Sequence, residues 1–434
     1  MKVAIIGSGF CGMSAAYETA KAGHETTIFE RDAMPGGLAA TFHVGGQELE
    51  KFYHHWLGTD EDIFSFAREL GYGSKLKFIT SKVGIYYANE NYRFSSPLDL
   101  LRFKPLPFLS RIRFGLSILY SWTIRDTSHL EKETAVNWLR RVSGKNAYET
   151  IWKPLLIGKF GEEYYQDVAA IWIWNKLIQR GKSRDAKAKE FLGYYDGGFS
   201  AFIRDLLAKI EEFGGKIKYG SEVEQIKTKN GNQLDLKINS KWETFDRVIY
   251  TGHTPELADL YRASDFETQA KKLDKIQYLA NVCLILETSE SLSDTYWLNV
   301  NDVSFPFVGI IEHTNFEPID SYDGKHLIYL SKYVPQSHTL YSMSSQEMLE
   351  FAIPHLKRLF PKFDETSISR SFLWKANFAQ PLICKDFSQI IPPIRSEIAN
   401  FYVSTMAQVY PEDRGTNYAV KNGRSVGRLV AEKN

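Results

Sequence analysis

The chain has 434 residues, a length that suits about three domain-sized pieces. Its hydrophobic (44%) and charged (24%) fractions are ordinary for a soluble globular protein and exclude a wholly disordered chain. The 53 basic and 52 acidic side chains leave a net charge of +1, which provides no overall attraction to nucleic acid. The aromatic fraction of 14% is compatible with either an aromatic core or a large apolar pocket.

The N-terminal residues predict a β-α-β unit. Lys2–Ile6 is a short apolar run that is typical of a buried parallel strand. Ser14–Ala22 has helical composition and ends at Gly23, and His24–Glu30 predicts a second strand. The apolar run is too short, and too interrupted by glycine, to be the core of a secretory signal peptide.

A glycine-rich motif between the first strand and the helix predicts a dinucleotide-binding site. It fits G-x-G-x-x-G and consists of Gly7, Ser8, Gly9, Phe10, Cys11 and Gly12. Its first glycine permits a tight turn, the second lets a pyrophosphate approach the backbone, and the third lets the helix pack on the strand. Glu30, at the end of the second strand, is placed to accept hydrogen bonds from an adenosine ribose. Cys11 is either a thiol activated by the helix dipole or, as we expect, a small packing residue.

Residues 98–192 show mainly helical periodicity, for example over Leu130–Val142, which Gly144 closes. The apolar run Phe114–Ile124 follows several basic residues, namely Arg102, Lys104, Arg111 and Arg113. Such a segment could rest on a membrane surface, although a helix packed against its own domain is the simpler interpretation. The chain has no uncharged apolar run of about 18 residues, so we expect no membrane-spanning helix.

The second half of the chain predicts a helix at 200–213, followed by strands at 216–219, 222–227, 233–238 and 245–250. Asn230-Gly231 is a strong hairpin-turn signal between two of these strands. Residues 276–335 are strand-rich, 344–360 helical, and a last strand at 400–404 precedes a helix at 416–432. This order predicts one α/β nucleotide-binding domain, interrupted by insertions that form a second domain.

The cysteines argue against a disulfide framework and against a metal site. Cys11, Cys283 and Cys384 are few and scattered, and no Cys/His cluster indicates zinc. A reducing cytoplasm is therefore the simplest location for the protein, with peripheral membrane contact as an addition.

Further motifs are spread along the chain. Glu30-Arg31 is followed by the glycine pair Gly36-Gly37, and Ala379-Gln380-Pro381 precedes the last predicted strand. Together with the segments 221–226, 245–251 and 401–404, these motifs resemble the flavin-containing amine oxidase superfamily. That group includes protoporphyrinogen oxidases, carotenoid desaturases and, as a relative, UDP-galactopyranose mutase.

The resemblance implies an α/β fold in which a Rossmann-like FAD-binding domain of the glutathione-reductase type is interrupted by a mixed α+β substrate domain with a helical insertion. The FAD-binding domain would comprise residues 1–80, 196–260 and 391–434. The helical region would span 81–195, and the substrate-domain sheet would span 261–390.

The resemblance also implies the residues that bind FAD. Beyond the glycine-rich motif these are Glu30, Arg31, Gly36, Gly37, Leu38, Val223, Thr251, Glu412, Gly415 and Thr416. The family's Gly-Asp near the last strand is replaced here by residues 405–408, which leaves the contacts at the flavin end open. Relatives with covalent flavin use a C-terminal cysteine, and none follows Cys384, so we expect FAD to be bound non-covalently.

The candidates for catalysis are His54, His55 and Lys159. The two histidines follow the glycine pair, in a stretch that leads past the flavin in relatives. Adjacent residues on a strand point to opposite faces, so they are not a zinc pair. Lys159 lies in Tyr148–Gly161, a segment loosely similar to one in UDP-galactopyranose mutases. Ordinary packing explains all three residues equally well.

Three functions follow from the resemblance. The first is an FAD-dependent oxidoreductase that takes a hydride from an amine or from an unsaturated, largely apolar small molecule. The second is a non-redox enzyme similar to the sugar mutases, acting on a nucleotide sugar with reduced FAD; its diphosphate clamps would be Lys153, Lys159, Arg180 and Arg184. The third is a flavin-binding protein with only an interaction role.

Many of the 61 aromatic residues lie outside the cofactor motifs, several of them in and just after the helical insertion. We expect them to form an aromatic wall opposite the flavin, and they are Trp122, Trp138, Trp152, Trp172, Trp174, Tyr194, Tyr195 and Phe199.

Overall fold

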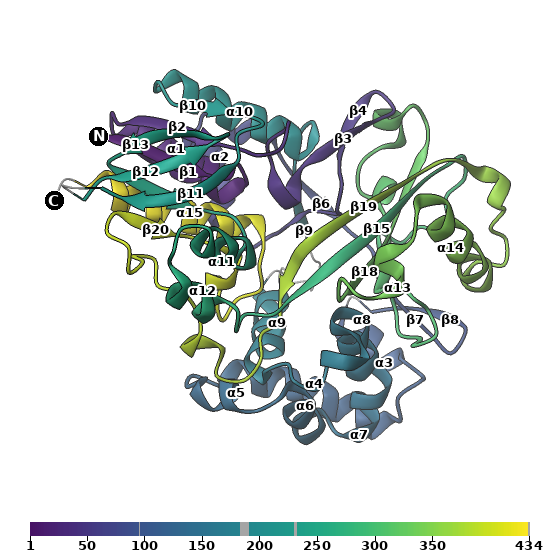
Figure 1. The fold of residues 1–434 in the computed structure, drawn as a ribbon. Helices are drawn as coiled ribbons and strands as arrows, with labels where there is room; N and C mark the ends of the chain where they lie inside the picture. Colours follow the sequence, from purple (N-terminus) through teal and green to yellow (C-terminus); the bar gives the residue numbers. More distant parts are fainter. Residues whose placement is uncertain (95, 183–190, 230–231, 433–434) are drawn as a thin grey trace.

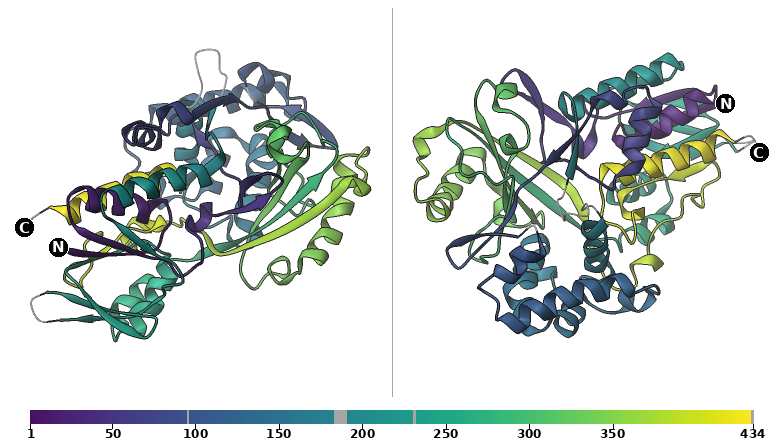
Figure 2. Two further views of the ribbon diagram at one scale, coloured as in Figure 1. Left: turned by 90° about the horizontal axis from the view of Figure 1, so that it is seen from above. Right: turned by 180° about the vertical axis from the view of Figure 1, so that it is seen from behind.

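The computed structural model describes residues 1–94, 96–182, 191–229 and 232–432 (Figure 1). An α/β domain carries both chain ends, a large β-sheet lies beside it, and a group of helices lies below the two (Figures 1 and 2). The predicted turn at Asn230-Gly231 and the candidate clamp Arg184 fall outside the described residues.

A five-stranded sheet forms the centre of the α/β domain, and every neighbouring pair in it is parallel. In order across the sheet, its strands are β10 (Lys216–Lys218), β2 (Glu25–Phe29), β1 (Lys2–Ile6), β14 (Arg247–Tyr250) and β20 (Phe401–Val403). Since the strands are parallel, the loops that follow β1, β2 and β14 meet at one edge.

Both faces of this sheet are covered, which explains its nearly continuous apolar strands. On one face, Val3 and Ile5 join a core cluster with α1 (Phe10–Lys21), α10 (Gly198–Glu212) and α15 (Thr416–Ala431). On the other, Ala4 joins a cluster with the antiparallel sheet β11 (Val223–Thr228), β12 (Leu234–Ile238) and β13 (Lys241–Phe245). The helices α11 (Thr254–Arg262) and α12 (Glu267–Leu273) complete that second layer.

A seven-stranded mixed sheet forms the second domain. In order, its strands are β19 (Ile368–Pro381), β15 (Tyr278–Thr288), β18 (His326–Val334), β17 (Gly309–Glu312), β16 (Trp297–Val300), β7 (Val83–Tyr87) and β8 (Glu90–Arg93). All neighbours are antiparallel except β16 and β7. The helix α14 (Ser345–Leu359) packs on one face through Met348 and Leu356, near the short α13 (Thr339–Ser342).

Short strands and one buried carboxylate join the domains. The connecting elements are the hairpin β3 (Thr41–Val44) and β4 (Gln47–Glu50), the sheet of β5 (Trp56–Leu57), β9 (Phe191–Tyr195) and β6 (Leu76–Thr80), and the helix α2 (Glu61–Glu69). The Glu50 carboxylate accepts hydrogen bonds from the Tyr194 hydroxyl (2.9 Å) and the Phe199 amide (2.8 Å). The Tyr329 hydroxyl donates to the Glu50 carbonyl at 2.7 Å, which ties β4 to β18.

The helical region packs under the large sheet around a core of its own. It consists of α3 (Pro97–Arg102), α4 (Phe108–Thr123), α5 (Ser128–Lys132), α6 (Ala135–Ser143), α7 (Lys145–Ala147), a π-helical turn (Tyr148–Trp152), α8 (Lys153–Tyr164) and α9 (Ala170–Lys182). Among the described residues, the structure contains no helix that is long and apolar enough to cross a bilayer.

Two sequence predictions need correction here. The region 81–195 is not helical throughout, because β7, β8 and β9 lie within it and pair with strands from other parts of the chain. The helix predicted over Leu130–Val142 is two helices, since α5 ends at Lys132 and the Thr134 hydroxyl caps α6 by accepting the Asn137 amide at 3.3 Å.

Candidate functional site

The turn after β1 is built from glycines that serve two different purposes. Gly7 has a φ of +100°, a conformation that only glycine adopts easily. A Cβ on Gly12 would lie 2.0 Å from the Gly7 carbonyl oxygen, so α1 can begin this close to β1 only with glycine there. A Cβ on Gly9 would meet no atom within 4 Å, so open space faces the helix N-terminus.

Glu30 is a buried carboxylate that holds this turn in place. Its Oε2 accepts the Ser8 amide (2.8 Å) and the Ser8 hydroxyl (2.6 Å), while its Oε1 accepts the Asp32 amide (3.0 Å). A carboxylate has about four acceptor positions, so capacity remains for a sugar hydroxyl. This geometry is compatible with the predicted role of Glu30 as a ribose-binding acid beside a phosphate-binding turn.

The glycine pair lies directly against the first turn. Gly36 and Gly9 form a parallel bridge, in which the Gly36 amide donates to the Ser8 carbonyl at 3.0 Å. Gly36 and Gly37 both have positive φ, which turns the chain into a short 3₁₀ helix at Gly37–Ala39. Leu38, in that turn, lines the large cavity described below.

The helices α1 and α15 run parallel and in contact. A Cβ on Gly423 would lie 2.2 Å from the Cys11 carbonyl oxygen, and one on Gly427 would lie 2.7 Å from that of Ala15. Because Gly423 lies opposite Cys11, the N-terminal end of α15 extends past the N-terminal end of α1 by about six residues, or ~9 Å. Two helix N-termini, each a partial positive charge, therefore follow one another along the direction that an extended dinucleotide would take.

The other predicted cofactor residues are distributed around this edge. Thr251 follows β14, and its hydroxyl donates to the Ile6 carbonyl at 2.9 Å, beside Gly7. Gly415 is the N-cap of α15, and the Thr416 hydroxyl accepts the Trp56 indole N–H at 2.8 Å. Val223 begins β11, and Glu412 lies in the loop before α15.

Three predicted residues have side chains engaged elsewhere. The Phe10 ring stacks on Phe202 in the core, so only its backbone is available at the turn. The exposed Arg31 pairs with Glu256 at 2.7 Å. Burial raises the pKa of the Cys11 thiol to about 11, which makes Cys11 a packing residue beside Ser404 rather than an activated thiol.

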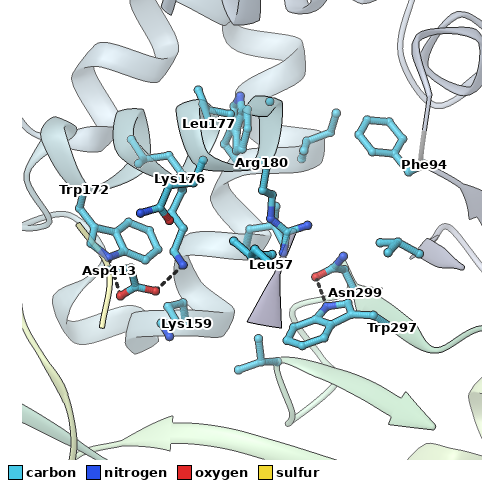
Figure 3. A pocket seen from close by; sticks show the side chains of 18 of the residues that line it. Leu57, Phe94, Lys159, Trp172, Lys176, Leu177, Arg180, Trp297, Asn299 and Asp413 are labelled. Atoms are coloured by element: carbon cyan, nitrogen blue, oxygen red, sulfur yellow. Dashed lines mark hydrogen bonds and ion pairs between the residues drawn. The ribbon is translucent and has the colours of Figure 1, made fainter. Parts of the chain in front are cut away.

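A cavity of about 1120 Å³ extends from the turns that contain Leu38 and Gly415 into the helical region. Its lining is mainly aliphatic and aromatic and comes from the α/β domain, the large sheet and the helices α3, α4, α8 and α9. Figure 3 shows part of this lining, including Leu57, Phe94, Leu177 and Trp297. Gly415 and Thr416 also reach the cavity, so its inner end adjoins the predicted cofactor site.

Both candidate histidines line the cavity and are neutral. Burial lowers the pKa of His54 to about 4 and that of His55 to about 3. The Nδ1 of His54 lies 2.6 Å from the Phe52 carbonyl oxygen, which can only accept, so Nδ1 carries the proton and Nε2 is an acceptor. The Nδ1 of His55 lies 2.8 Å from the Tyr296 hydroxyl.

A charged cluster occupies the end of the cavity nearest α15. Lys176 forms an ion pair with Asp413 (2.5 Å), which also accepts the Trp172 indole N–H at 3.2 Å (Figure 3). Lys159 lies 4.0 Å above the Tyr333 ring. Although burial opposes it, the cations Lys176, Lys159 and Arg414 together lower the pKa of Asp413.

Basic side chains outnumber acidic ones in the whole lining. The basic residues are Arg111, Lys159, Lys176, Arg180 and Arg414, and the acidic ones are Asp60 and Asp413. The sequence indicates Lys159 as a candidate for catalysis, but it does not indicate that Lys176, Asp413 and Arg414 belong to the substrate site. These three residues come together only when α9 packs against the loop before α15.

The predicted aromatic wall is present only in part. Trp122, Trp152 and Trp172 line the cavity, joined by Trp297 and Phe94, which had not been proposed. Trp138, Tyr194, Tyr195 and Phe199 are instead buried in core clusters, and Trp174 donates its indole N–H to the Ser121 carbonyl. The positions of aromatic residues in the sequence do not show which of them line the cavity and which are buried in the core.

The residues of the nucleotide site fit FAD. Open space at Gly9 and Gly415, a buried acid with acceptor capacity and two staggered helix N-termini match a long dinucleotide whose ring system ends at the cavity. The described residues contain no cluster of His, Cys, Asp and Glu that could hold a metal ion.

Comparisons with known proteins agree with this site. Residues 10–407 match the family model of flavin-containing amine oxidoreductases. The chain is 32% identical over 319 residues to a zeta-carotene desaturase of Synechocystis sp., covering 65% of this chain and 63% of that protein. It is 27% identical over 165 residues to a 15-cis-phytoene desaturase of Synechococcus elongatus, an alignment that spans 35% of each chain.

Solved structures share the fold of the whole chain. A crystal structure of a putative protoporphyrinogen oxidase from Exiguobacterium sp. superposes with a TM-score of 0.77 and 14% identity, covering 99% of this chain and 98% of that one. At that identity the likeness establishes the fold alone, whereas the family match spans nearly the whole sequence. The chain belongs to the flavin-containing amine oxidoreductase family.

Proposed function

We propose that the protein is an FAD-dependent oxidoreductase that removes a hydride from an unsaturated, largely apolar substrate. The observation that carries this proposal is the cavity of about 1120 Å³, lined mainly by aliphatic and aromatic side chains, whose inner end adjoins the cofactor site. Such a lining gains most from an apolar ligand, at roughly 25 cal/mol per Å² of apolar surface removed from water.

The charges in the cavity favour this substrate class over amines. A protonated amine entering the inner end would meet Lys159, Lys176 and Arg414, and the carboxylate of Asp413 is already engaged by Lys176 and Trp172. Because the surroundings are largely apolar, like charges there repel more strongly than in water. The amine branch of the sequence hypothesis is therefore the less favoured one.

When bound, non-covalent FAD would supply the hydride acceptor. The protein's own contribution is to position the substrate and exclude water. His54 presents only an acceptor to the cavity, so it can orient a donor but cannot supply a proton at neutral pH. The three free cysteines support non-covalent binding: Cys11 packs beside Ser404, Cys283 is buried in a core cluster, and burial raises the pKa of the Cys384 thiol to about 11.

The test is anaerobic bleaching of the bound flavin. The purified protein should be yellow and release FAD on denaturation, and linear polyenes such as phytoene or zeta-carotene should bleach its absorbance. A panel of primary and secondary amines should leave the absorbance unchanged. Bleaching by amines alone, or a colourless protein that FAD does not reconstitute, would overturn the proposal.

The same preparation tests the mutase alternative. Pre-reduced enzyme would be mixed with UDP-galactopyranose, and the sugar product would be analysed. Ring contraction without net electron transfer would replace the oxidoreductase proposal with the non-redox one, for which Lys159 and Arg180 are the clamps that reach the cavity.

A further inference from the structure

Exposed apolar side chains are concentrated on α3 and α4. Of the seventeen large hydrophobic residues exposed in the described chain, nine fall within 98–122. We call them the α3–α4 surface, and they are Leu98, Leu101, Phe108, Leu109, Ile112, Leu116, Leu119, Tyr120 and Trp122. Single exposed apolar residues are ordinary, but a contiguous group of this size marks an interaction site.

The helix α4 turns its apolar side outward. Leu109 and Leu116 are 80% and 59% exposed, whereas the buried residues of the helix are Phe114 and two serines, Ser117 and Ser121. Each buried serine hydroxyl donates to a carbonyl of the same helix, Ser117 to Phe114 (2.7 Å) and Ser121 to Ser117 (2.8 Å). A surface helix of a globular protein in water has the reverse arrangement, with its apolar stripe on the core.

The α3–α4 surface surrounds the entrance to the cavity. Five of its residues also line the cavity, namely Leu101, Ile112, Leu116, Leu119 and Trp122. The Trp122 ring reaches across to α9, where a Cβ on Gly181 would lie 2.5 Å from it. The apolar lining is therefore continuous from the cofactor end of the cavity to the outer surface of the helical region, which lies at the bottom of the molecule in Figure 1.

Basic residues accompany the apolar ones. Between residues 97 and 125 the chain has one acid, Asp99, and the bases Arg102, Lys104, Arg111, Arg113 and Arg125. Arg102, Lys104, Arg113 and Arg125 are exposed. A second copy of the chain docked face to face would bring these like charges together, whereas anionic lipid headgroups would neutralise them.

We propose that the α3–α4 surface docks on an anionic lipid bilayer. The apolar side chains of α3 and α4 enter the acyl-chain boundary, Tyr120 and Trp122 lie at the level of the interface, and the basic residues meet the headgroups. If the proposed function holds, the apolar substrate passes from the bilayer into the cavity without crossing water.

Vesicle co-sedimentation tests the docking directly. Holoenzyme is mixed with vesicles of phosphatidylcholine alone, or with about 30% phosphatidylglycerol added, and then pelleted. We expect binding to the anionic vesicles that weakens as salt is raised. If the wild-type protein pellets with neither kind of vesicle, the proposal is wrong.

A matched pair of variants locates the contact. Phe108→Glu/Leu109→Glu changes two exposed residues of the surface that do not line the cavity, and it should reduce vesicle binding by about tenfold or more. Val303→Glu/Trp242→Glu changes two residues that are similarly exposed elsewhere, and it should bind as the wild type does. Equal FAD content and equal melting temperatures establish that both variants are folded.

Two other outcomes show whether the α3–α4 surface binds a lipid bilayer or a second copy of the chain. A dimer in sedimentation velocity that Phe108→Glu/Leu109→Glu dissociates, without vesicle binding, would assign the surface to a second copy and overturn the proposal. Vesicle binding requires no turnover, so docking that persists when no polyene bleaches the flavin would uphold the membrane contact and reject the proposed function.

Discussion

At the scale of single residues, the glycines of the first turn separate folding from cofactor binding. Gly12 is required by the fold, since any Cβ there would overlap the Gly7 carbonyl. Gly9 is not, since its neighbourhood is empty in the protein itself. We propose that Gly9 serves a ligand that approaches the backbone.

Substitution of these two glycines should therefore give different results. Gly9→Ala should fold with a wild-type unfolding free energy but lose most of its FAD affinity, because the new methyl group occupies the phosphate approach. Gly12→Ala should lose both stability and FAD. Denaturant unfolding of the apoprotein and FAD titration measure the two quantities, with Gly115→Ala, where a methyl group has room, as the control. A Gly9→Ala protein that binds FAD normally would contradict this assignment.

Buried histidines make the stability depend on pH. Burial lowers the pKa of His313 to about 3, and its Nε2 lies 2.9 Å from the Tyr322 hydroxyl. Below about pH 6.5 the unfolded chain takes up a proton that the folded protein does not, so the free energy of unfolding falls as the pH falls. This contribution is fully present above that pH and decreases through the acid range.

The variant His313→Gln should lose less stability on acidification than the wild type. From about pH 6.5 to pH 5 the difference should be roughly 2 kcal/mol, at about 1.4 kcal/mol per unit of pH. Urea unfolding at both pH values measures it, with the exposed His43→Gln as the comparison. Identical acid sensitivity in all three proteins would show that His313 does not titrate as inferred.

At the scale of elements, the sequence predicts best where one pattern governs one element. The strands β1 and β2 and the helices α10, α14 and α15 follow their predicted ranges closely, because apolar periodicity and end signals agree. The helix α1 begins at Phe10, four residues before its predicted start at Ser14, because its first turn lies within the glycine-rich motif. The sequence does not predict the strand β19: its residues 368–377 are half-buried or exposed, and its pairing with the almost fully buried β15 makes it a strand. The helical periodicity of α4 also does not indicate which side of the helix faces outward.

The contact between α1 and α15 is a property of two elements that depends on Gly423 and Gly427. Gly423→Ala places a methyl group 2.2 Å from the Cys11 carbonyl oxygen, so the helices must move apart. We expect a loss of roughly 1–3 kcal/mol in the free energy of unfolding, together with weaker FAD binding. Thermal melting and FAD titration test this, and wild-type values for both would refute the close packing.

At the scale of the whole molecule, the cofactor site is assembled from distant parts of the chain. The first turn, the glycine pair, β14 and α15 meet at one sheet edge although more than 400 residues separate the first from the last. These parts carry recognisable motifs, so the nucleotide half of the site could be predicted. The charged end of the cavity could not be predicted. Lys176 lies outside every motif, and Asp413, although it lies within the segment predicted for the flavin end, meets Lys176 only through packing.

FAD should therefore stabilise the whole protein. With free FAD at about 100 times its dissociation constant, mass action predicts roughly 2.7 kcal/mol of added stability. FMN, which lacks the adenosine that Glu30 is placed to hold, should add much less at equal concentration. Apoprotein melting with each flavin measures the difference, and equal shifts would show that the adenosine end is not recognised.

The place of α15 in the sequence has a consequence for synthesis. The ribosome delivers β1, α1 and β2 first, but β14, β20 and the helix that packs against α1 come only with residues 247–431. An emerging chain has a phosphate-binding turn without the parallel helix that completes the site beside it. We therefore expect FAD to load only after α15 has packed against α1.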